Sequence, residues 1–211
     1  MSLVSIVLAR CRANPTRRFF SKELENILLT NWQTVPYKYR GRTYEIPEST
    51  RIKLIDFGGA CYDDEKKKSS IINTRQYRAP EVILEAGWTL SSDLWSAGCI
   101  LAELYTGELL FATHDNLEHL ALMEKIIGPF PRRILKRAKH SQVASEAFDS
   151  NGRHRLDHVL PSESASYVRK QVPLKSIIRE EDGRFLQVLR RILVIDPDER
   201  ASAHECVRYR L

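Results

Sequence analysis

Three short motifs in this chain have residue types and spacing that suit phosphate chemistry. Asp56-Phe57-Gly58 follows an alternating apolar segment and opens a charged loop. A carboxylate held beside a glycine turn can bind Mg²⁺ that bridges nucleotide phosphates. This motif alone is weak evidence, but Ala79-Pro80-Glu81 and Asp93-x-Trp95-x-x-Gly98 follow it at suitable distances. Three matches in this order favour a phosphotransfer site over an unrelated turn and an unrelated buried helix.

Two segments before the first motif have the alternating pattern of β-strands. Residues 42–46 and 52–55 alternate apolar and polar side chains, and Pro47-Glu48-Ser49 between them favours a turn. We therefore predict a β-hairpin that ends immediately before Asp56.

The later part of the chain has a helical pattern. Residues 93–104 are apolar on nearly every side, which is typical of a buried helix. Ser91 or Ser92 can cap its start, and Gly107 lies just past its end. Further helices are predicted at residues 116–127, 184–194 and 201–209, whereas residues 138–166 are polar and weakly patterned. The predicted fold class is mostly α with a small β-hairpin element.

Two segments resemble a known family. Residues 73–81, Asn-Thr-Arg-Gln-Tyr-Arg-Ala-Pro-Glu, are similar to the substrate (P+1) segment of the CMGC group of protein kinases. Residues 118–128, Glu-His-Leu-Ala-Leu-Met-Glu-Lys-Ile-Ile-Gly, resemble the E-H-L-A-M-M-E-R-I-L-G signature of the LAMMER (CDC-like) dual-specificity kinases. Its own pattern predicts only an amphipathic helix, with Leu117, Leu120, Met123 or Glu124, and Ile127 on one face. The resemblance alone makes this helix a family marker.

The resemblance implies a protein-kinase-like fold in which this chain forms the C-terminal lobe, with the N-lobe absent. It covers residues 25–211 as a partial kinase domain, with a LAMMER-type insert at about 112–170, and leaves residues 1–24 without a match. The implied activity is ATP- and Mg²⁺-dependent phosphorylation of serine and threonine, with autophosphorylation of tyrosine, on Arg/Ser-rich splicing factors. The alternative is a non-catalytic, pseudokinase-like docking or scaffold module.

The resemblance also implies roles for single residues. Asn26 and Asp56 are expected to bind the Mg²⁺ that accompanies ATP. The other implied positions are Thr74, Tyr77 and Arg78 for the substrate segment, Glu81 paired with Arg200, Asp93 and Trp95 for the architecture, and Ser69 and Ser70 as candidate phosphosites. For the two serines, an unmodified solvated loop is the favoured alternative.

The expected catalytic loop is incomplete. Family members have Asp-Leu-Lys-Pro-Glu-Asn-Ile-Leu-Leu, whereas residues 21–29 are Ser-Lys-Glu-Leu-Glu-Asn-Ile-Leu-Leu. Ser21 therefore takes the position of the catalytic aspartate, and Glu23 takes that of the catalytic-loop lysine. No G-x-G-x-x-G loop occurs in the sequence. Loss of the base alone costs about 10²–10⁴ in rate, so we predict that the chain as written is catalytically incompetent.

Net charge, apolar runs, cysteines and the first 21 residues indicate which partners and which cellular location to expect. The net charge of +6 is scattered, without interleaved aromatic residues, so direct nucleic-acid binding is not expected. No apolar run approaches the length of a membrane span, and four dispersed cysteines suggest reduced thiols in an intracellular protein. Residues 1–21 contain four arginines and no acid, which fits a mitochondrial presequence. An incorrectly assigned start is favoured instead, and the family implies a nuclear or nucleocytoplasmic protein.

Overall fold

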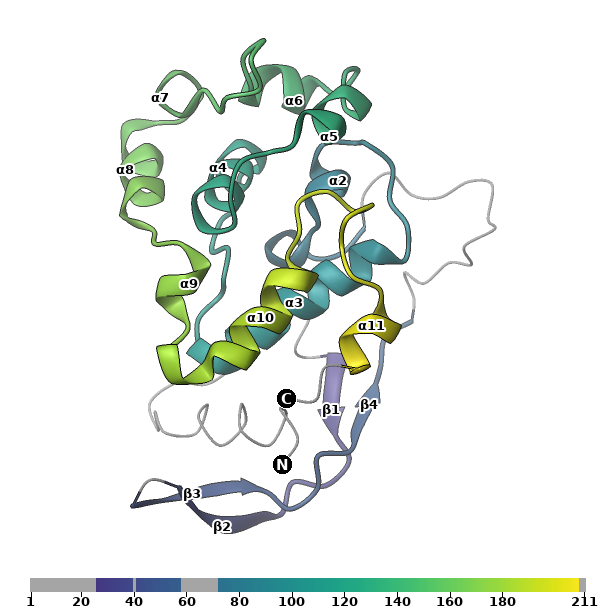
Figure 1. Cartoon of the computed structure of the whole chain (residues 1–211), viewed down its shortest axis with the longest axis vertical. Helices are drawn as coiled ribbons and strands as arrows, with labels where there is room; N and C mark the ends of the chain where they lie inside the picture. Colours follow the sequence, from purple (N-terminus) through teal and green to yellow (C-terminus); the bar gives the residue numbers. More distant parts are fainter. Residues whose placement is uncertain (1–25, 40, 58–71, 209–211) are drawn as a thin grey trace.

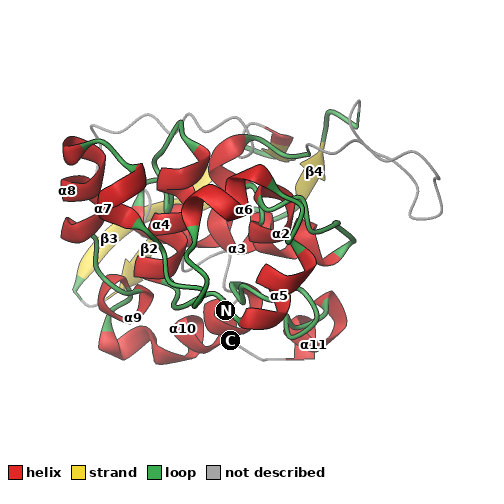
Figure 2. Cartoon of the chain, turned by 90° about the horizontal axis from the view of Figure 1, so that it is seen from above, coloured by secondary structure: helices red, strands yellow, loops and turns green. Residues whose placement is uncertain are grey.

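The computed structural model describes residues 26–39, 41–57 and 72–208, and helices make up most of this part (Figure 1). Paired strands lie below the helical body in the view of Figure 1. The helices surround α3 (Ser91–Thr106), which lies near the centre both in Figure 1 and in the view from above in Figure 2. The mostly helical fold class predicted from the sequence is confirmed.

The strands form two antiparallel pairs. β2 (Thr34–Tyr39) pairs with β3 (Arg42–Pro47), and β1 (Ile27–Leu29) pairs with β4 (Ile52–Leu54). The extended segments were predicted at nearly the right places, but the predicted pairing of residues 42–46 with 52–55 is wrong. Gly41, with a φ of 76°, turns β2 back onto β3. The stretch after β3 then leads into β4, which lies alongside β1 and not alongside β3.

Helix α3 confirms the predicted buried helix, although its start differs from the prediction. Gly107 ends the helix with a φ of 80°, and its N–H donates to the Glu103 carbonyl at 2.7 Å. The N-cap residue is Leu90, without a side-chain cap, so the predicted capping by Ser91 or Ser92 is wrong. The Ser92 hydroxyl instead donates to a buried carboxylate described below.

The core forms where α3 packs against α10 (Gly183–Ile192). A β-carbon on Gly98 would lie 2.8 Å from both Ile192 Cγ2 and Leu193 Cδ2, so the absence of a side chain permits this close approach. Tyr105 and Phe185 join the two helices further along, with ring centroids 5.0 Å apart. The helix predicted at 184–194 is confirmed as α10, and the structure shows that it packs against α3.

Helix α4 (Asn116–Ile126) is more deeply buried than its sequence pattern predicts. The Asp115 side chain accepts from the Glu118 N–H at 2.9 Å and caps its start, and Gly128 follows its end. The prediction of one apolar face is too narrow, because the helix packs between α2, α6 and α8. Its buried residues are His119, Leu120, Ala121, Leu122, Met123 and Ile126.

Shorter elements complete the helical body. They are η2 (Arg75–Tyr77), α2 (Pro80–Ile83), α5 (Arg132–Arg137), α6 (Gln142–Ala147), α7 (Leu156–Val159), α8 (Ser162–Lys170), α9 (Leu174–Ile177), η3 (Glu180–Asp182) and α11 (Ala203–Arg208). The weakly patterned stretch 138–166 therefore contains three of these helices in whole or part. Ser202 and Glu205 cap the start of α11 reciprocally, since the Ser202 N–H donates to the carboxylate and the Glu205 N–H donates to the hydroxyl.

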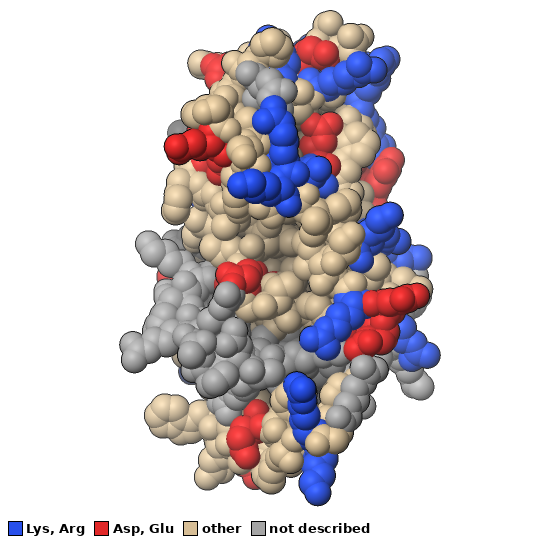
Figure 3. All heavy atoms as spheres, turned by 90° about the vertical axis from the view of Figure 1, so that its left-hand side faces the viewer, with Lys and Arg blue, Asp and Glu red and all other residues tan. Residues whose placement is uncertain are grey.

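The outer surface carries charges of both signs. On the face shown in Figure 3, Lys and Arg side chains are interspersed with Asp and Glu side chains, so the net positive charge does not form one continuous basic surface there. Within the described ranges, no helix is both long enough and apolar enough to cross a membrane.

Candidate functional site

The pairing of β1 with β4 brings Asn26 and Asp56 to one end of a strand ladder. Ile27 lies opposite Leu54, and the Ile55 N–H donates to the Asn26 carbonyl at 3.0 Å. Asp56 follows directly and is exposed. The two candidate metal ligands are far apart in the sequence, so it is the strand register that places them near each other.

Asp56 has a backbone conformation that is unusual for a residue other than glycine. Its φ is 61°, in the left-handed region. Such conformations cost about 1–3 kcal/mol and concentrate at functional sites. An Asp carboxylate with an Asn amide oxygen at the same end of the ladder suits Mg²⁺, which proteins hold through one or two carboxylates together with phosphate and water oxygens. These two residues therefore fit a magnesium–nucleotide site.

The predicted substrate segment is fixed to α3 through a chain of buried polar contacts. The Asn73 amide donates to Ser96 Oγ at 2.5 Å, and this hydroxyl donates to the Tyr77 carbonyl at 2.8 Å. The Tyr77 hydroxyl donates to Glu103 Oε2 at 2.6 Å. Asn73 itself has a φ of 59°. The segment between Asn73 and Tyr77 is therefore held at both ends by one helix.

The same segment is joined to the start of α4. The Gln76 amide donates to the Thr113 carbonyl at 3.2 Å, and the Arg75 guanidinium donates to Asn116 Oδ1. Arg78 closes the segment on itself, because its Nε donates to the Ile72 carbonyl at 3.1 Å. Burial and the nearby Arg75 charge lower the pKa of Arg78. Contacts to α3, to Thr113 and to the first residue of α4 thus hold the segment that would face a substrate.

Of the other residues predicted for this region, Thr74 lies within the described part of the chain and the three serines do not. Thr74 is half-buried and precedes η2 in an extended conformation. Ser21, at the position of the catalytic aspartate, lies outside the described residues, and so do Ser69 and Ser70. Their roles stay predictions.

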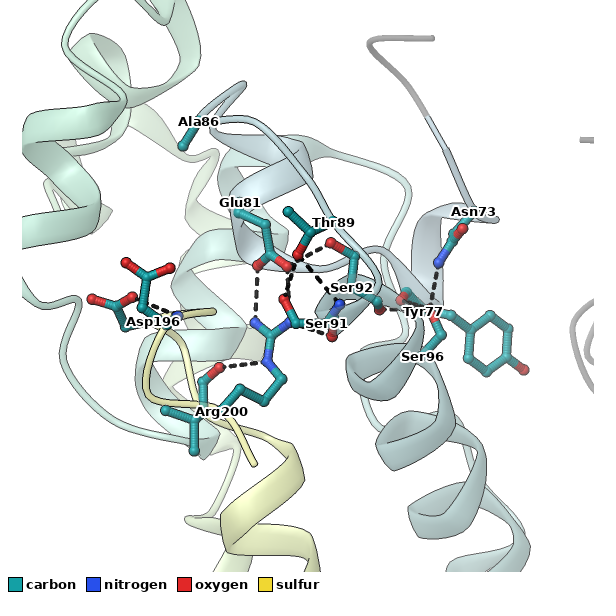
Figure 4. A network of polar contacts seen from close by, with 12 residues as sticks. Asn73, Tyr77, Glu81, Ala86, Thr89, Ser91, Ser92, Ser96, Asp196 and Arg200 are labelled. Atoms are coloured by element: carbon teal, nitrogen blue, oxygen red, sulfur yellow. Dashed lines mark hydrogen bonds and ion pairs between the residues drawn. The ribbon is translucent and has the colours of Figure 1, made fainter. Parts of the chain in front are cut away.

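The predicted pair of Glu81 and Arg200 is present and buried (Figure 4). Arg200 Nη1 and Nη2 donate to the two Glu81 oxygens at 2.8 and 2.9 Å, and both side chains are 0% exposed. The Ser92 hydroxyl adds a third donor to the carboxylate at 2.7 Å. The guanidinium also donates to the carbonyls of Ser91 at 2.7 Å and Val194 at 3.0 Å. This network joins α2 and α3 to the loop after α10.

Trp95 is buried beside this network, whereas Asp93 is exposed. The guanidinium carbon of Arg200 lies 5.3 Å from the Trp95 ring centroid, which is within the range of a cation–π contact. Trp95 is also stacked on Phe111, with ring centroids 5.8 Å apart. Asp93 is exposed in the first turn of α3.

His119 is a buried residue to which the sequence assigned no role. It lies in α4, is 0% exposed, and within the described part of the chain neither ring nitrogen has a hydrogen-bond partner. Burial, and after it the charges of Arg78 and Arg75, lower the pKa of His119 to about 3. The imidazole is therefore neutral at physiological pH and packs as a ring against Phe111, with centroids 5.2 Å apart.

Three polar residues of α3 that support the site were not identified from the sequence. Ser92, Ser96 and Glu103 all face the 73–81 segment, as their hydrogen bonds show. Their spacing of four and seven residues places them on one side of the helix. Polar residues in one row of a helix that is otherwise apolar all round are the signal that could have revealed them.

Burial of Glu103 leads to a pH-dependent prediction. Desolvation raises its pKa, although the Tyr77 hydrogen bond acts in the opposite direction. Between the pKa of this glutamate in the unfolded chain and its raised pKa in the folded protein, the folded state binds more protons than the unfolded state. The stability therefore falls as pH rises through this interval, and the ionised carboxylate lowers the stability at neutral pH. We expect Glu103→Gln, which keeps an acceptor for Tyr77, to raise stability relative to wild type more at pH 7 than at pH 4 in urea unfolding.

Glu103→Leu is the matched control for this prediction. It removes the carboxylate that accepts the Tyr77 hydrogen bond, and loss of such a buried bond costs about 1–3 kcal/mol at either pH. Equal effects of Glu103→Gln at pH 4 and pH 7 would show that the carboxylate does not titrate differently in the folded protein.

The fold and this site define the chain as a member of the protein kinase domain family, whose model matches residues 23–211. The crystal structure of PF14_0431, kinase domain, superposes with a TM-score of 0.79 at 43% identity, covering 88% of this chain and 56% of that chain. The relatives include the dual specificity protein kinase lkh1 of Schizosaccharomyces pombe, 40% identical over 87% of this chain and 27% of the relative. The predicted likeness to LAMMER, or CDC-like, dual-specificity kinases is confirmed.

Two other matched relatives are also protein kinases. The serine/threonine-protein kinase AFC3 of Arabidopsis thaliana is 42% identical over 87% of this chain and 48% of the relative. The dual specificity protein kinase CLK4 of Homo sapiens is 40% identical over 88% of this chain and 38% of the relative. The chain thus spans less than half the length of each of these three relatives.

Proposed function

We propose that this chain forms the substrate-recognising C-terminal lobe of an ATP-dependent protein serine/threonine kinase with dual specificity. The observation that carries the proposal is the attachment of residues 73–78 to α3 and to the start of α4. The same chain has a strand ladder whose register brings Asn26 and Asp56 to one end. A peptide substrate must be held in a fixed position relative to the reacting phosphate, because positioning supplies much of the rate of phosphoryl transfer.

The residues of the chain would act on Mg²⁺-ATP and on the substrate in different ways. Asn26 and Asp56 would hold Mg²⁺, which supplies charge neutralisation on the phosphates when it is bound. Tyr77 and Arg78 would shape the surface under the substrate residue that follows the phosphorylated one. Family likeness supports Arg/Ser-rich proteins as substrates and a nuclear or nucleocytoplasmic location, and both are part of the proposal.

The proposal also includes the catalytic incompetence of residues 1–211 when assayed alone. In this sequence Ser21 takes the position of the catalytic aspartate, and a serine cannot serve as the carboxylate base there. In that form the chain would act as the alternative hypothesis states, as a module that docks partners without phosphorylating them.

A chimaeric kinase tests the proposal. Residues 25–211 are joined to the nucleotide-binding lobe and catalytic loop of a matched dual-specificity kinase, and transfer from Mg²⁺-[γ-³²P]ATP to an Arg/Ser-rich peptide is measured. We expect transfer by the chimaera, a loss of about 10²–10³-fold with Asp56→Asn, and no transfer by residues 1–211 alone.

The controls separate folding from function. Circular dichroism of the chimaera and of its Asp56→Asn variant must show the same unfolding temperature. A folded chimaera that transfers no phosphate, or one that Asp56→Asn leaves unchanged, contradicts the proposed function. Transfer by residues 1–211 alone that Asp56→Ala abolishes contradicts the proposed incompetence.

A further inference from the structure

A hollow of about 530 Å³ lies between α5 and α6, outside the site described above. The two helices are neighbours at the top of the molecule in Figure 1. Leu135, Ala138 and Phe148 give the hollow an apolar lining, and the turn of residues 149–152 closes one end. This turn lies close to α5, because a β-carbon on Gly152 would be 3.0 Å from Leu135 Cδ1. The volume is that of a site for a few side chains of a ligand.

Helix α5 divides its basic residues between two sides. Arg133 lies 2.7 Å from Asp196 and 3.5 Å from Glu199, and Arg137 lies 3.2 Å from Asp198, so these two arginines are neutralised by the loop after α10. Because these acids pair with Arg133 and Arg137 within the protein, the two arginines offer a partner no unpaired positive charge on this side.

The cations on the other side of α5 line the hollow. Arg132 and Lys136 are one helical turn apart, and Lys139 follows the end of the helix. All three are exposed, and within the described ranges none forms an ion pair with a carboxylate. Three cations therefore border an apolar hollow, and none of them is paired with an acid as Arg133 and Arg137 are.

One carboxylate, Asp149, also lies at the edge of the hollow, but it accepts hydrogen bonds from the backbone of its own turn. Its Oδ1 accepts the N–H groups of Asn151 at 2.8 Å and Arg153 at 2.9 Å. These backbone donors lower the pKa of Asp149 and fix the carboxylate in the turn. The hollow keeps an excess of positive charge.

We propose that the hollow between α5 and α6 is a docking site for an acidic peptide segment of a protein partner. Carboxylates or phosphates of the peptide lie on Arg132, Lys136 and Lys139, and an apolar side chain of the peptide fills the space over Leu135 and Phe148. Complementary charge at the edge of an apolar site favours encounter with an acidic partner and excludes basic ones. Binding of this kind needs no phosphoryl transfer and does not depend on the proposed function.

A peptide fits this site better than a nucleic-acid backbone does. The cations span only about two helical turns, or about 10 Å, whereas a nucleic acid gains affinity from many phosphate contacts along a stripe. The apolar floor gives an aliphatic or aromatic side chain a place to be buried, which sugar and phosphate groups cannot use.

Fluorescence anisotropy with the full chain of residues 1–211 tests the proposal. The labelled ligand is a short peptide in which glutamates flank a leucine. Counterparts carry glutamine for glutamate, phosphoserine for glutamate, or serine for leucine. We expect the glutamate peptide to bind about tenfold more tightly than the glutamine and serine-for-leucine peptides. Tighter binding of the phosphoserine peptide would identify phosphate, rather than carboxylate, as the preferred acidic group.

Two double variants with the same change in net charge locate the site. Lys136→Glu/Lys139→Glu should weaken binding about tenfold or more, whereas Lys170→Glu/Lys175→Glu, at exposed positions elsewhere, should change it by less than about threefold. The four lysines are exposed, so both variants should unfold at the wild-type temperature.

Three results would overturn the proposal. The first is equal binding of acidic and neutral peptides, or of the leucine and serine peptides. The second is an equal loss of affinity in the two double variants. The third is binding of a labelled oligonucleotide that depends on Lys136 and Lys139 and is tighter than that of either acidic peptide, which would make this a nucleic-acid surface.

Discussion

Replacing Arg200 with alanine is expected to lower the free energy of unfolding by about 3–5 kcal/mol. The change leaves the Glu81 carboxylate, 0% exposed, with the Ser92 hydroxyl but without the two guanidinium donors. A buried charge that loses its partner keeps its full desolvation cost. Urea unfolding followed by circular dichroism at pH 7 measures the effect, and the unfolding temperature should fall by roughly 6–20 °C.

An exposed ion pair provides the control for Arg200→Ala. Arg137 and Asp198 lie 3.2 Å apart, with side chains 34% and 55% exposed, so Arg137→Ala should cost at most about 1 kcal/mol. Glu81→Leu/Arg200→Met removes both buried charges and should cost less than Arg200→Ala alone, because no unpaired charge remains. If Arg200→Ala is no worse than Arg137→Ala, the buried pair does not hold α2 and α3 to the C-terminal loop.

Trp95→Ala is expected to lower the free energy of unfolding by about 3–5 kcal/mol through a different mechanism. Trp95 is 0% exposed and is stacked on Phe111, so truncation opens a cavity in the core that neighbouring side chains fill only in part. Denaturant unfolding of the variant measures this loss.

The chain contains a matched control, since Trp32 is 89% exposed. Trp32→Ala should change the stability by less than about 0.5 kcal/mol. Trp95→Phe should cost less than Trp95→Ala, because the indole N–H has no hydrogen-bond partner among the described residues and its loss breaks none. Similar effects of Trp95→Ala and Trp32→Ala would contradict the central position given to Trp95.

The elements of the fold were more predictable from the sequence than their contacts. Residues 93–104 could be identified as a buried helix because apolar side chains lie on all sides and Gly107 follows. The strands could be located from their alternation, but their partners could not, because a period of two is the same whichever strand lies alongside. β1 and β4 flank the β2–β3 hairpin, which turns at Gly41, and their pairing continues from that hairpin.

In the candidate site, too, residues in motifs could be predicted from the sequence, whereas most of their contacts could not. The pairing of Glu81 with Arg200 was expected from family resemblance and is present, because both residues lie in motifs of fixed spacing. Ser92 was expected to cap a helix, yet it donates to Glu81, and only the packing of α2 on α3 reveals this. Likewise, the basic residues 132–139 form one cluster in the sequence. The structure separates them into a neutralised side and an open side, since acids 60 or so residues later reach only one of the two.

The ladder of β1 and β4 has a consequence for how relatives of this chain can differ in length. The separation of Asn26 and Asp56 depends on the register of Ile27 with Leu54, and not on how many residues lie between the two strands. Insertions or deletions at the tip of the β2–β3 hairpin, near Gly41, therefore leave the two proposed metal ligands in place. A single added residue within β1 or β4 would instead turn the following side chains to the opposite face. Evolution can lengthen or trim the hairpin freely while the residue count within its two short flanking strands stays fixed.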